Sequence, residues 1–354
     1  MKTNEEKWTL VAGGAGFIGS HLCRTLLEAG KKVVCLDNLQ TARRANLDEL
    51  KRFDGFRFIE ADISEPLPVE ITTDARSIGR IYNLACAASP VLYQADPEHT
   101  MLTNVVGTDR LLRLAEQSGA RFLLSSTSEV YGDPDVHPQP ETYRGNVSCT
   151  GPRACYDEGK RAAEALTFDF ARAGRADVRV ARIFNTYGPQ MRMDDGRVIS
   201  NFICQTLANE SLTIYGDGEQ TRSFCYVEDT VDGLIRLMEA DMPEFQPVNI
   251  GNQQEISIAQ LVEALAAIAG SPLPLTHRPL PVDDPRRRRP DLAQARRLLG
   301  WEPATPLNEG LARTFEWFAE EQASSTSNRN TRQADRDSGR MEAFVARAKV
   351  EAAG

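Results

Sequence analysis

The sequence predicts an α/β protein in which a doubly wound parallel sheet carries a smaller C-terminal lobe. Three observations support this prediction. Short apolar, β-branched runs alternate with helical patterns through the first half of the 354 residues. A glycine-rich turn follows the first of these runs. Beyond Gly188 the composition shifts toward proline, glycine and turn residues, with only short helical patterns between them.

The expected strands follow one another at the spacing of strand and helix units. They are, in chain order, Trp8–Ala12, Lys31–Asp37, Phe56–Ile63, Arg80–Ala85, Arg121–Glu129 and Val178–Phe184. In the first helical pattern, which follows the glycine turn, Leu22, Leu26 and Leu27 fall on one face. Further helices are expected near Asn104–Ser118 and from Tyr156 to about Ala173. This alternation predicts a parallel sheet, because parallel neighbours need crossover connections.

The second half of the chain is expected to form the smaller lobe, partly interleaved with the sheet. Short helices are predicted there at Val198–Ala208, Val227–Ala240 and Ile258–Ala269. We assign residues 1–188 mainly to the sheet domain and residues 189–322 mainly to the lobe. Residues 323–354 are rich in Ser, Thr, Asn, Arg and Asp, so we expect a disordered tail with at most a short terminal helix.

The charge balance restricts the partners of the chain. Lysine and arginine number 41 against 50 aspartate and glutamate residues, which gives a formal net charge of -9. Such a protein repels polyanions at long range, so nucleic acid is not an expected partner, and an anionic ligand would need a local basic pocket. No apolar run is as long as a membrane helix, and the start lacks an apolar signal region. We therefore expect no membrane contact and a cytoplasmic location.

Cysteine and histidine usage argues against a metal site. The seven cysteines are scattered and never spaced C-x-x-C, and the four histidines lie far apart in the sequence. Neither a disulfide framework nor a thiolate or imidazole metal site is expected. We expect the cysteines to be small, buried apolar residues. The chemistry of the protein must then come from other groups.

The clearest local motif is the glycine pattern Gly13-x-x-Gly16-x-x-Gly19, placed between the first strand and the first helix. Glycine permits a tight turn, lets the backbone approach a pyrophosphate and allows the helix to pack against the sheet. The helix N-terminus adds free amide donors and a partial positive charge. A merely tight turn is the alternative, but the strand and helix around the motif favour a dinucleotide site.

The second strand ends in Asp37, 18 residues after Gly19. A carboxylate at this place can accept hydrogen bonds from an adenosine ribose and repels the 2′-phosphate of NADP. NAD is therefore the expected cofactor. Arg43 and Arg44 lie close by in the sequence and leave NADP as an open alternative.

A tyrosine and a lysine lie four residues apart on a predicted helix. Tyr156 and Lys160 then project from one face. A free tyrosine is a poor base, but a neighbouring ammonium group favours the phenolate and lowers the pKa of the phenol. The pair alone is common by chance, and a packed ring on a surface helix is the alternative. The polar segment 125–129, SSTSE, ends the fifth strand of the same sheet and favours a catalytic interpretation, because ligands of open α/β sheets lie at the carboxyl ends of strands.

Seven longer motifs resemble one family. They are GGAGFIGSH, STSEVYGDP, GPRACYDEGKR, ARIFNTYGP, DDGRVISNF, YGDGEQTRSF and RRPDLAQARRLLGWEP. These segments are similar to the extended short-chain dehydrogenase/reductases, and within them to the UDP-glucuronate decarboxylases, from about Thr9 to Phe318. The resemblance implies a Rossmann-like sheet domain, a substrate-binding lobe, NAD as the cofactor, UDP-glucuronate as the substrate and a homodimer built through two helices of each subunit.

The resemblance also implies a reaction and roles within it. Tyr156 would remove the hydroxyl proton at carbon 4 of the sugar, and Lys160 would bind the nicotinamide ribose. The resulting ketone lets the carboxylate on carbon 5 leave as CO2, and Thr127 would help to stabilise the enolate. Glu129, or a water that it positions, would manage the proton delivered to carbon 5. Ser128 stands where related dehydratases have an aspartate that expels water, so it favours decarboxylation.

Two sets of binding residues follow from the same resemblance. The expected NAD contacts are Gly13, Gly16, Phe17, Ile18, Gly19, Asp37, Asn38, Thr41, Asp62, Ile63, Leu84, Ala85, Thr103, Tyr156 and Lys160. The expected substrate contacts are Asn185, Arg197, Asn201, Tyr215, Arg222 and Arg288, with Arg288 also placed near the reacting carboxylate. Guanidinium groups suit both phosphate and carboxylate. A solvated basic loop is the alternative for the four consecutive arginines at 286–289.

The chain departs from the family pattern at several places. Leu102 replaces a lysine that usually precedes the Thr-Asn pair, and residues 87–90 read AASP where the family has a pattern close to SPASP. Gln190 and Arg192 differ from the commoner arginine and histidine. The alternatives that stay open are a sugar-nucleotide 4,6-dehydratase or 4-epimerase, a decarboxylase that releases the UDP-4-keto-pentose, and an NAD-binding scaffold without activity.

Overall fold

The computed structural model describes residues 7–279 and 287–324 of the chain. Within them, seven parallel strands form one sheet in the order β11-β6-β5-β4-β1-β2-β3. The strands are β1 Trp8–Ala12, β2 Val33–Asp37, β3 Phe56–Glu60, β4 Ile78–Asn83, β5 Arg121–Thr127, β6 Val178–Ile183 and β11 Val248–Ile250. The predicted α/β class with a Rossmann-like parallel sheet is confirmed, and every strand expected from the sequence lies in this sheet.

The order of the strands reverses at β1. After β3 the chain crosses to β4, which lies on the other side of β1 from β2. Val11 of β1 is thus paired with Cys35 of β2 on one side and with Tyr82 of β4 on the other. Such a reversal leaves a crevice at the carboxyl ends of the two central strands, and this crevice is where open α/β sheets bind their ligands.

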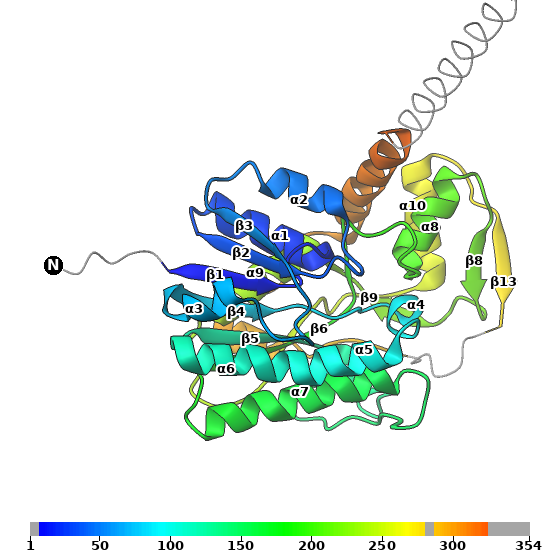
Figure 1. The fold of residues 1–354 in the computed structure, drawn as a ribbon. Helices are drawn as coiled ribbons and strands as arrows, with labels where there is room; N and C mark the ends of the chain where they lie inside the picture. Colours follow the sequence, from blue (N-terminus) through cyan, green and yellow to red (C-terminus); the bar gives the residue numbers. More distant parts are fainter. Residues whose placement is uncertain (1–6, 280–286, 325–354) are drawn as a thin grey trace, which may run out of the picture.

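Helices cover both faces of the sheet, because its strand residues alternate between two cores. On one face Val11 packs with α1 (Phe17–Glu28) and α9 (Val227–Glu239). On the other, Leu10 packs in a cluster that also holds residues of α6 (Thr108–Ser118) and α7 (Ala154–Arg172). Figure 1 shows α6 and α7 running side by side along one face of the sheet.

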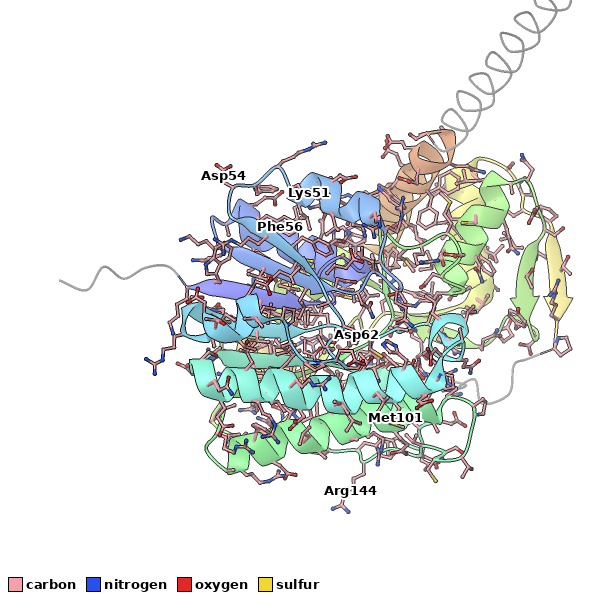
Figure 2. The ribbon with its side chains drawn as sticks, viewed as in Figure 1. Lys51, Asp54, Phe56, Asp62, Met101 and Arg144 are labelled. Atoms are coloured by element: carbon pink, nitrogen blue, oxygen red, sulfur yellow. The ribbon has the colours of Figure 1, made fainter. Side chains whose placement is uncertain are left out.

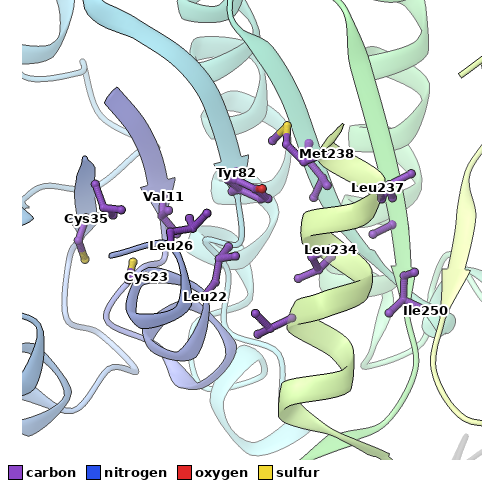
Figure 3. Packing of buried hydrophobic residues seen from close by; sticks show 14 of the residues in the cluster. Val11, Leu22, Cys23, Leu26, Cys35, Tyr82, Leu234, Leu237, Met238 and Ile250 are labelled. Atoms are coloured by element: carbon purple, nitrogen blue, oxygen red, sulfur yellow. The ribbon is translucent and has the colours of Figure 1, made fainter. Parts of the chain in front are cut away.

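The first core shows how distant segments meet. Figure 3 shows Leu22 and Leu26 of α1 on one side of Tyr82, and Leu234 and Leu237 of α9 on the other. All of these side chains are buried. Burying one leucine contributes about 1.5–3 kcal/mol, so α9 is held firmly to the sheet although its sequence lies beyond residue 188.

The lobe has a core and small sheets of its own. Phe202 of α8 (Val198–Leu207), Leu261 of α10 (Ile258–Ala269) and Phe318 of the helix over 307–324 are buried together. The paired strands are β8 Leu212–Tyr215 with β13 Leu275–Arg278, β9 Thr221–Ser223 with β12 Glu255–Ser257, and β7 Thr186–Tyr187 with β10 Cys225–Tyr226. Figure 1 shows this lobe beyond the carboxyl edge of the large sheet.

The remaining helices are short. They are α2 Arg44–Leu50, α3 Val69–Thr73, α4 Pro90–Tyr93, α5 Pro97–Leu102 and α11 Ala293–Leu299, with the turns η1 Ala75–Ser77, η2 Thr103–Gly107 and η3 Ser128–Tyr131. Residues 323 and 324 end the last described helix, and the rest of the expected tail, 325–354, lies outside the described residues. The division at residue 188 stays a prediction; α9 and β11 follow residue 188 in the sequence, yet they pack with the large sheet.

Candidate active site

A cavity of about 700 Å³ lies between the carboxyl edge of the sheet and the lobe. Every residue that the sequence analysis placed in the cofactor, catalytic and substrate sets lines this cavity, from Gly13 to Arg288. The fold therefore brings the predicted set together in one place. The individual roles of these residues stay predictions. In Figure 2, Asp62 lies at the carboxyl edge of the sheet, on the side that faces the lobe.

The turn between β1 and α1 requires its glycines. Gly13 has a φ of 78°, and a Cβ atom there would lie 2.7 Å from the backbone of Leu84 and Ala85. A Cβ on Gly19 would lie 2.0 Å from the carbonyl oxygen of Gly13. Gly16 caps α1 without a side-chain hydrogen bond, so the first amides of the helix keep their donors for another partner. This cradle of backbone fits a pyrophosphate.

The acid at the end of β2 is built into the same turn. Asp37 is buried and accepts hydrogen bonds from the backbone N–H groups of Ala15 at 3.0 Å and Leu39 at 2.8 Å. Burial raises the pKa of Asp37, and the backbone donors only partly oppose this. The carboxylate thus shapes the wall of the cavity beside the turn. A contact with the ribose of a dinucleotide stays a prediction.

A second acid lies farther along the cofactor side of the cavity. Asp62 accepts hydrogen bonds from Asn38 Nδ2 at 2.7 Å and from the Ser64 hydroxyl at 2.6 Å, and its other neighbour is His99 Nε2 at 2.7 Å. Burial alone would raise the pKa of Asp62, but these hydrogen bonds outweigh burial and lower it to about 2. The carboxylate is therefore ionised and holds the loop after β2 to the loop after β3.

Tyr156 and Lys160 project from one face of α7 into the cavity, as the spacing predicts. Lys160 Nζ lies 5.8 Å from the centroid of the Tyr156 ring and donates a hydrogen bond of 2.8 Å to the carbonyl oxygen of Ser125. The Thr127 hydroxyl is hydrogen-bonded to the Tyr156 phenol. The end of β5 and the start of α7 therefore meet at one point of the cavity.

The pKa of the tyrosine differs from the expectation. Burial raises the pKa of Tyr156, and the hydrogen bond from Thr127 only partly opposes it. Burial also lowers the pKa of Lys160. The expected lowering of the phenol pKa by a neighbouring ammonium group was wrong for this state of the protein, because desolvation outweighs every charge near the ring. The phenol is therefore protonated at neutral pH.

The sequence analysis missed a tyrosine that fixes the Tyr156 ring. Tyr93 at the end of α4 stacks on Tyr156, with ring centroids 4.9 Å apart and an angle of 3° between the planes. Tyr93 is buried and does not line the cavity, so it contacts the Tyr156 ring on the side away from the cavity. No periodicity signals such a contact, since the two residues lie 63 positions apart.

The catalytic acid predicted from the motif lies between two arginines. Glu129 Oε1 accepts a hydrogen bond of 2.5 Å from Arg288 Nη1, and its other oxygen is paired with Arg153. Burial would raise the pKa of Glu129, but Arg288 and Arg153 outweigh it and lower the pKa to about 2. Glu129 is therefore ionised across the physiological range. Arg153 was not among the predicted residues, although it belongs to the quoted motif GPRACYDEGKR.

Arg288 keeps donors for a ligand. Its side chain is 8% exposed, and its Nε and Nη2 atoms have no hydrogen-bond partner among the described residues. Buried guanidinium donors without partners are costly, so such atoms indicate a place for an anion. The Ser223 hydroxyl donates a hydrogen bond to the Arg288 carbonyl oxygen at 3.2 Å, and this fixes the backbone of the arginine beside the lobe.

The lobe side of the cavity carries the other predicted substrate residues. Arg197 pairs with Asp195 at 3.1 Å, and Asn201 Nδ2 donates to the carbonyl oxygen of Gly196 at 3.1 Å. Tyr215 is 40% exposed, which places it at the rim. The residues Asn185 and Arg222 line the cavity as well. Leu102, the departure from the family lysine, is exposed and does not line it.

Neither a membrane helix nor a metal cluster is found in the part of the chain that the structure describes. None of its helices combines the length and the apolar character needed to cross a membrane. Its His, Cys, Asp and Glu side chains form no group of three or more that could hold a metal ion.

A cavity shared between a dinucleotide crevice and an arginine-bearing lobe is the arrangement of an enzyme that oxidises or reduces an anionic substrate with a bound nicotinamide cofactor. The NAD dependent epimerase/dehydratase family matches residues 9–251, and the chain belongs to this family. The expected dependence on NAD is thereby confirmed.

Relatives narrow the family further. The chain is 51% identical to UDP-glucuronic acid decarboxylase 3 of Arabidopsis thaliana, over 85% of this chain and 86% of that protein. It is 47% identical to UDP-glucuronic acid decarboxylase 1 of Xenopus tropicalis, over 93% of this chain and 76% of that protein. The resemblance to the UDP-glucuronate decarboxylases is confirmed.

Solved structures share the fold at lower identity. The UDP-glucuronic acid 4-epimerase of Bacillus cereus in complex with UDP-glucuronic acid and NAD is 28% identical, with a TM-score of 0.77 over 88% of this chain and 99% of that one. The UDP-glucose 4-epimerase of Thermotoga maritima with UDP-glucose is 31% identical, with a TM-score of 0.80 over 89% of this chain and 99% of that one.

Proposed function

We propose that this chain converts UDP-glucuronate to UDP-xylose and CO2 through a UDP-4-keto intermediate, with NAD reduced and reoxidised within each turnover. The observation that carries the proposal is the buried guanidinium of Arg288, whose Nε and Nη2 donors have no partner among the described residues and which lines the same cavity as Tyr156 and Thr127. An arginine beside a tyrosine and a threonine hydroxyl suits a sugar acid whose carboxylate must be held while its ring is oxidised. The identity with UDP-glucuronic acid decarboxylases along the chain supports the same substrate.

The residues of the chain divide the chemistry between them. When bound, NAD supplies a cationic ring that accepts hydride from carbon 4 of the sugar and later returns it. Once NAD is bound, its cationic ring and the Lys160 ammonium would favour the phenolate of Tyr156, which would take the proton of the hydroxyl on carbon 4. The phenol so formed would then donate a hydrogen bond to the enolate that CO2 leaves behind. Thr127 contributes a second hydroxyl to the same oxygen. Lys160, fixed by the Ser125 carbonyl oxygen, holds the ribose next to Tyr156.

Arg288 and Glu129 are proposed to act on the substrate carboxylate and on the proton delivered to carbon 5. Arg288 holds the carboxylate until the ketone at carbon 4 allows it to leave. Glu129 has a pKa of about 2 and carries no proton to give at neutral pH. We therefore infer that Glu129 positions the water that delivers a proton to carbon 5. Ser128, whose hydroxyl is far too weak an acid to expel water from a sugar, fits decarboxylation rather than dehydration.

One incubation tests this proposal. The purified chain, NAD and UDP-glucuronate are mixed without an external reductant, and the nucleotide product is analysed by mass spectrometry. UDP-xylose with released CO2 supports the proposal. A product two hydrogens lighter than UDP-xylose identifies release of the UDP-4-keto-pentose. A new product with the same mass as UDP-glucuronate identifies a 4-epimerase, the activity named for the Bacillus cereus neighbour.

A homodimer and a cytoplasmic location are proposed together with this function. The sequence resemblance implies pairing through two helices of each subunit. Light scattering on the purified chain tests the dimer, and a monomeric mass at micromolar concentration would contradict it. The cytoplasmic location and the lack of nucleic-acid or membrane partners stay expectations from composition and charge.

A further inference from the structure

The last described helix reaches the cofactor side of the cavity. Arg43, which precedes α2, forms an ion pair with Glu321 of the helix over 307–324. The guanidinium carbon of Arg43 also lies 4.9 Å from the centroid of the Trp317 ring, one helical turn earlier. Figure 1 shows this helix, drawn in orange, against the end of α2. The helix over 307–324, which belongs to the lobe, thus pairs with Arg43 of the sheet domain.

Of the two arginines that left NADP open, Arg43 is the one that lines the cavity. It lines the cavity together with Asp37, which is expected at the adenosine ribose, and with Asn38 and Thr41, which are expected NAD contacts. Arg44, the other arginine that left NADP open, does not line the cavity, and its exposed side chain pairs with Glu60 at 3.5 Å. The question of NAD or NADP therefore concerns Arg43.

A 2′-phosphate carries a charge of about -1.5 to -2 at neutral pH and seeks a guanidinium group. In this structure the Arg43 guanidinium is already paired, and Trp317 contacts it through a cation–π interaction. A phosphate bound to Arg43 would compete with the Glu321 carboxylate and lie near the Asp37 carboxylate. Arg43 and Glu321 are 21% and 31% exposed at their side chains, so solvent screens their attraction only in part.

We propose that Glu321 is a specificity-determining residue of the cofactor site: by pairing with Arg43 it withholds this cation from a 2′-phosphate, so that the helix over 307–324 favours NAD over NADP. Glu321 acts through Arg43 and is a positioning residue. The inference rests on the cofactor half of the proposed function and is independent of which sugar reacts.

The test measures binding by calorimetry, with NAD and NADP titrated separately into the full chain. In Glu321→Gln the ratio of the NADP Kd to the NAD Kd should fall by about five-fold, which is the size expected for a partly exposed ion pair. The matched control is Glu320→Gln, which removes the same charge from the exposed neighbouring position and should leave the ratio unchanged. A ratio in Glu321→Gln equal to that of Glu320→Gln would overturn the inference.

The Arg43→Gln variant distinguishes an effect of the Arg43–Glu321 ion pair from an effect of the Glu321 charge alone. In Arg43→Gln, adding Glu321→Gln should leave the ratio of the two Kd values unchanged, because the cation through which Glu321 acts is gone. A five-fold fall that persists without Arg43 would overturn the proposed route. If the unmodified chain binds neither dinucleotide, the proposed function itself fails. If it binds NAD and only the Glu321 effect is missing, this inference alone fails.

Discussion

The orientation of Tyr156, the proposed proton acceptor, is set by the residues that surround its ring. Tyr93 stacks on one face of Tyr156, Thr127 bonds its hydroxyl and Lys160 lies 5.8 Å from its centroid. These contacts leave the ring little freedom, so the phenol stays directed at the cavity. Burial raises its pKa, which makes the phenol a persistent hydrogen-bond donor and its conjugate base a strong acceptor of the sugar proton.

Replacing Tyr156 with phenylalanine should remove the proton path and keep the packing. We expect kcat for UDP-xylose formation to fall roughly 10²- to 10⁴-fold, as for loss of a general acid–base group. NAD affinity, measured by calorimetry, should change little. The control is Tyr143→Phe, which removes a phenol outside the cavity and should leave kcat intact. Loss of cooperative unfolding in Tyr156→Phe would instead make the residue structural.

The pKa of Glu129 predicts a pH dependence of stability. Its folded value of about 2 lies below the ordinary value of 4.5, so the stabilisation is fully present above pH 4.5 and is lost as the pH falls through about 2. Glu129→Gln should therefore be less stable than the unmodified chain at neutral pH, because Arg288 and Arg153 each lose their ion pair with this carboxylate. The two unfolding free energies should converge as the pH falls from about 5 to about 2.

Denaturant titrations at several pH values measure this convergence. Glu158→Gln serves as the control, because Glu158 pairs with Arg161 at 3.4 Å on the outer part of α7 and does not line the cavity. Its difference from the unmodified chain should be small at every pH. A difference between Glu129→Gln and the unmodified chain that stays constant down to acid pH would contradict the ion pair.

The sequence motifs predicted which residues line the cavity better than they predicted which of these residues contact one another. Tyr156, Lys160 and Glu129 were identified from motifs, and the fold brings them to one cavity. Their protonation was not predictable, because burial is a property of the assembled cavity. Tyr93 and Arg153 were missed since neither shows a periodicity of its own, although both lie in segments that the comparison with the family covered.

Among the elements, the turn from β1 to α1 is the most constrained. Gly19 lets α1 pack against this turn, because a Cβ there would lie 2.0 Å from the carbonyl oxygen of Gly13. A Cβ on Gly16 would lie 3.3 Å from the same oxygen, a distance that a small shift relieves. The two glycines therefore differ in how much their replacement disturbs the helix N-terminus.

Gly19→Ala should lose NAD binding and lower the melting temperature, because backbone atoms must move apart to admit the methyl group. Gly16→Ala should keep the fold, with a smaller loss of NAD affinity. Calorimetry and thermal unfolding of the two variants compare the effects. Equal behaviour of both variants would show that close packing at Gly19 does not hold the turn.

Most of the longer helices and the strands of the large sheet from β1 to β6 were predicted from the sequence, and the shortest strands were not. β11, Val248–Ile250, has only three residues, which is too short for any period to appear. β8 pairs with β13 across more than 60 positions, so the partner of each strand is set by the tertiary fold. The helix over 307–324 and the short α2 were likewise not expected, and they meet at Arg43 and Glu321.

At the scale of the whole molecule, the carboxyl edge of the sheet forms one side of the cavity and the lobe forms the other. The glycine turn and Tyr156 belong to the sheet domain, while Arg222 and Arg288 come from residues that follow it in the chain. α9 and β11 tie the two parts together through the buried core around Leu234 and Ile250. A cofactor and an anionic ligand can therefore meet in one cavity although the chain has a net charge of -9.

The central claim is that two electrons leave the sugar at carbon 4 and return to the same carbon after CO2 is lost. Incubation of the chain with NAD and UDP-glucuronate in heavy water, read by mass spectrometry and nuclear magnetic resonance, tests it most directly. The account predicts UDP-xylose with a single solvent deuteron at carbon 5 and none at carbon 4. A product that keeps the carboxylate carbon, or that carries solvent deuterium at carbon 4, would contradict it.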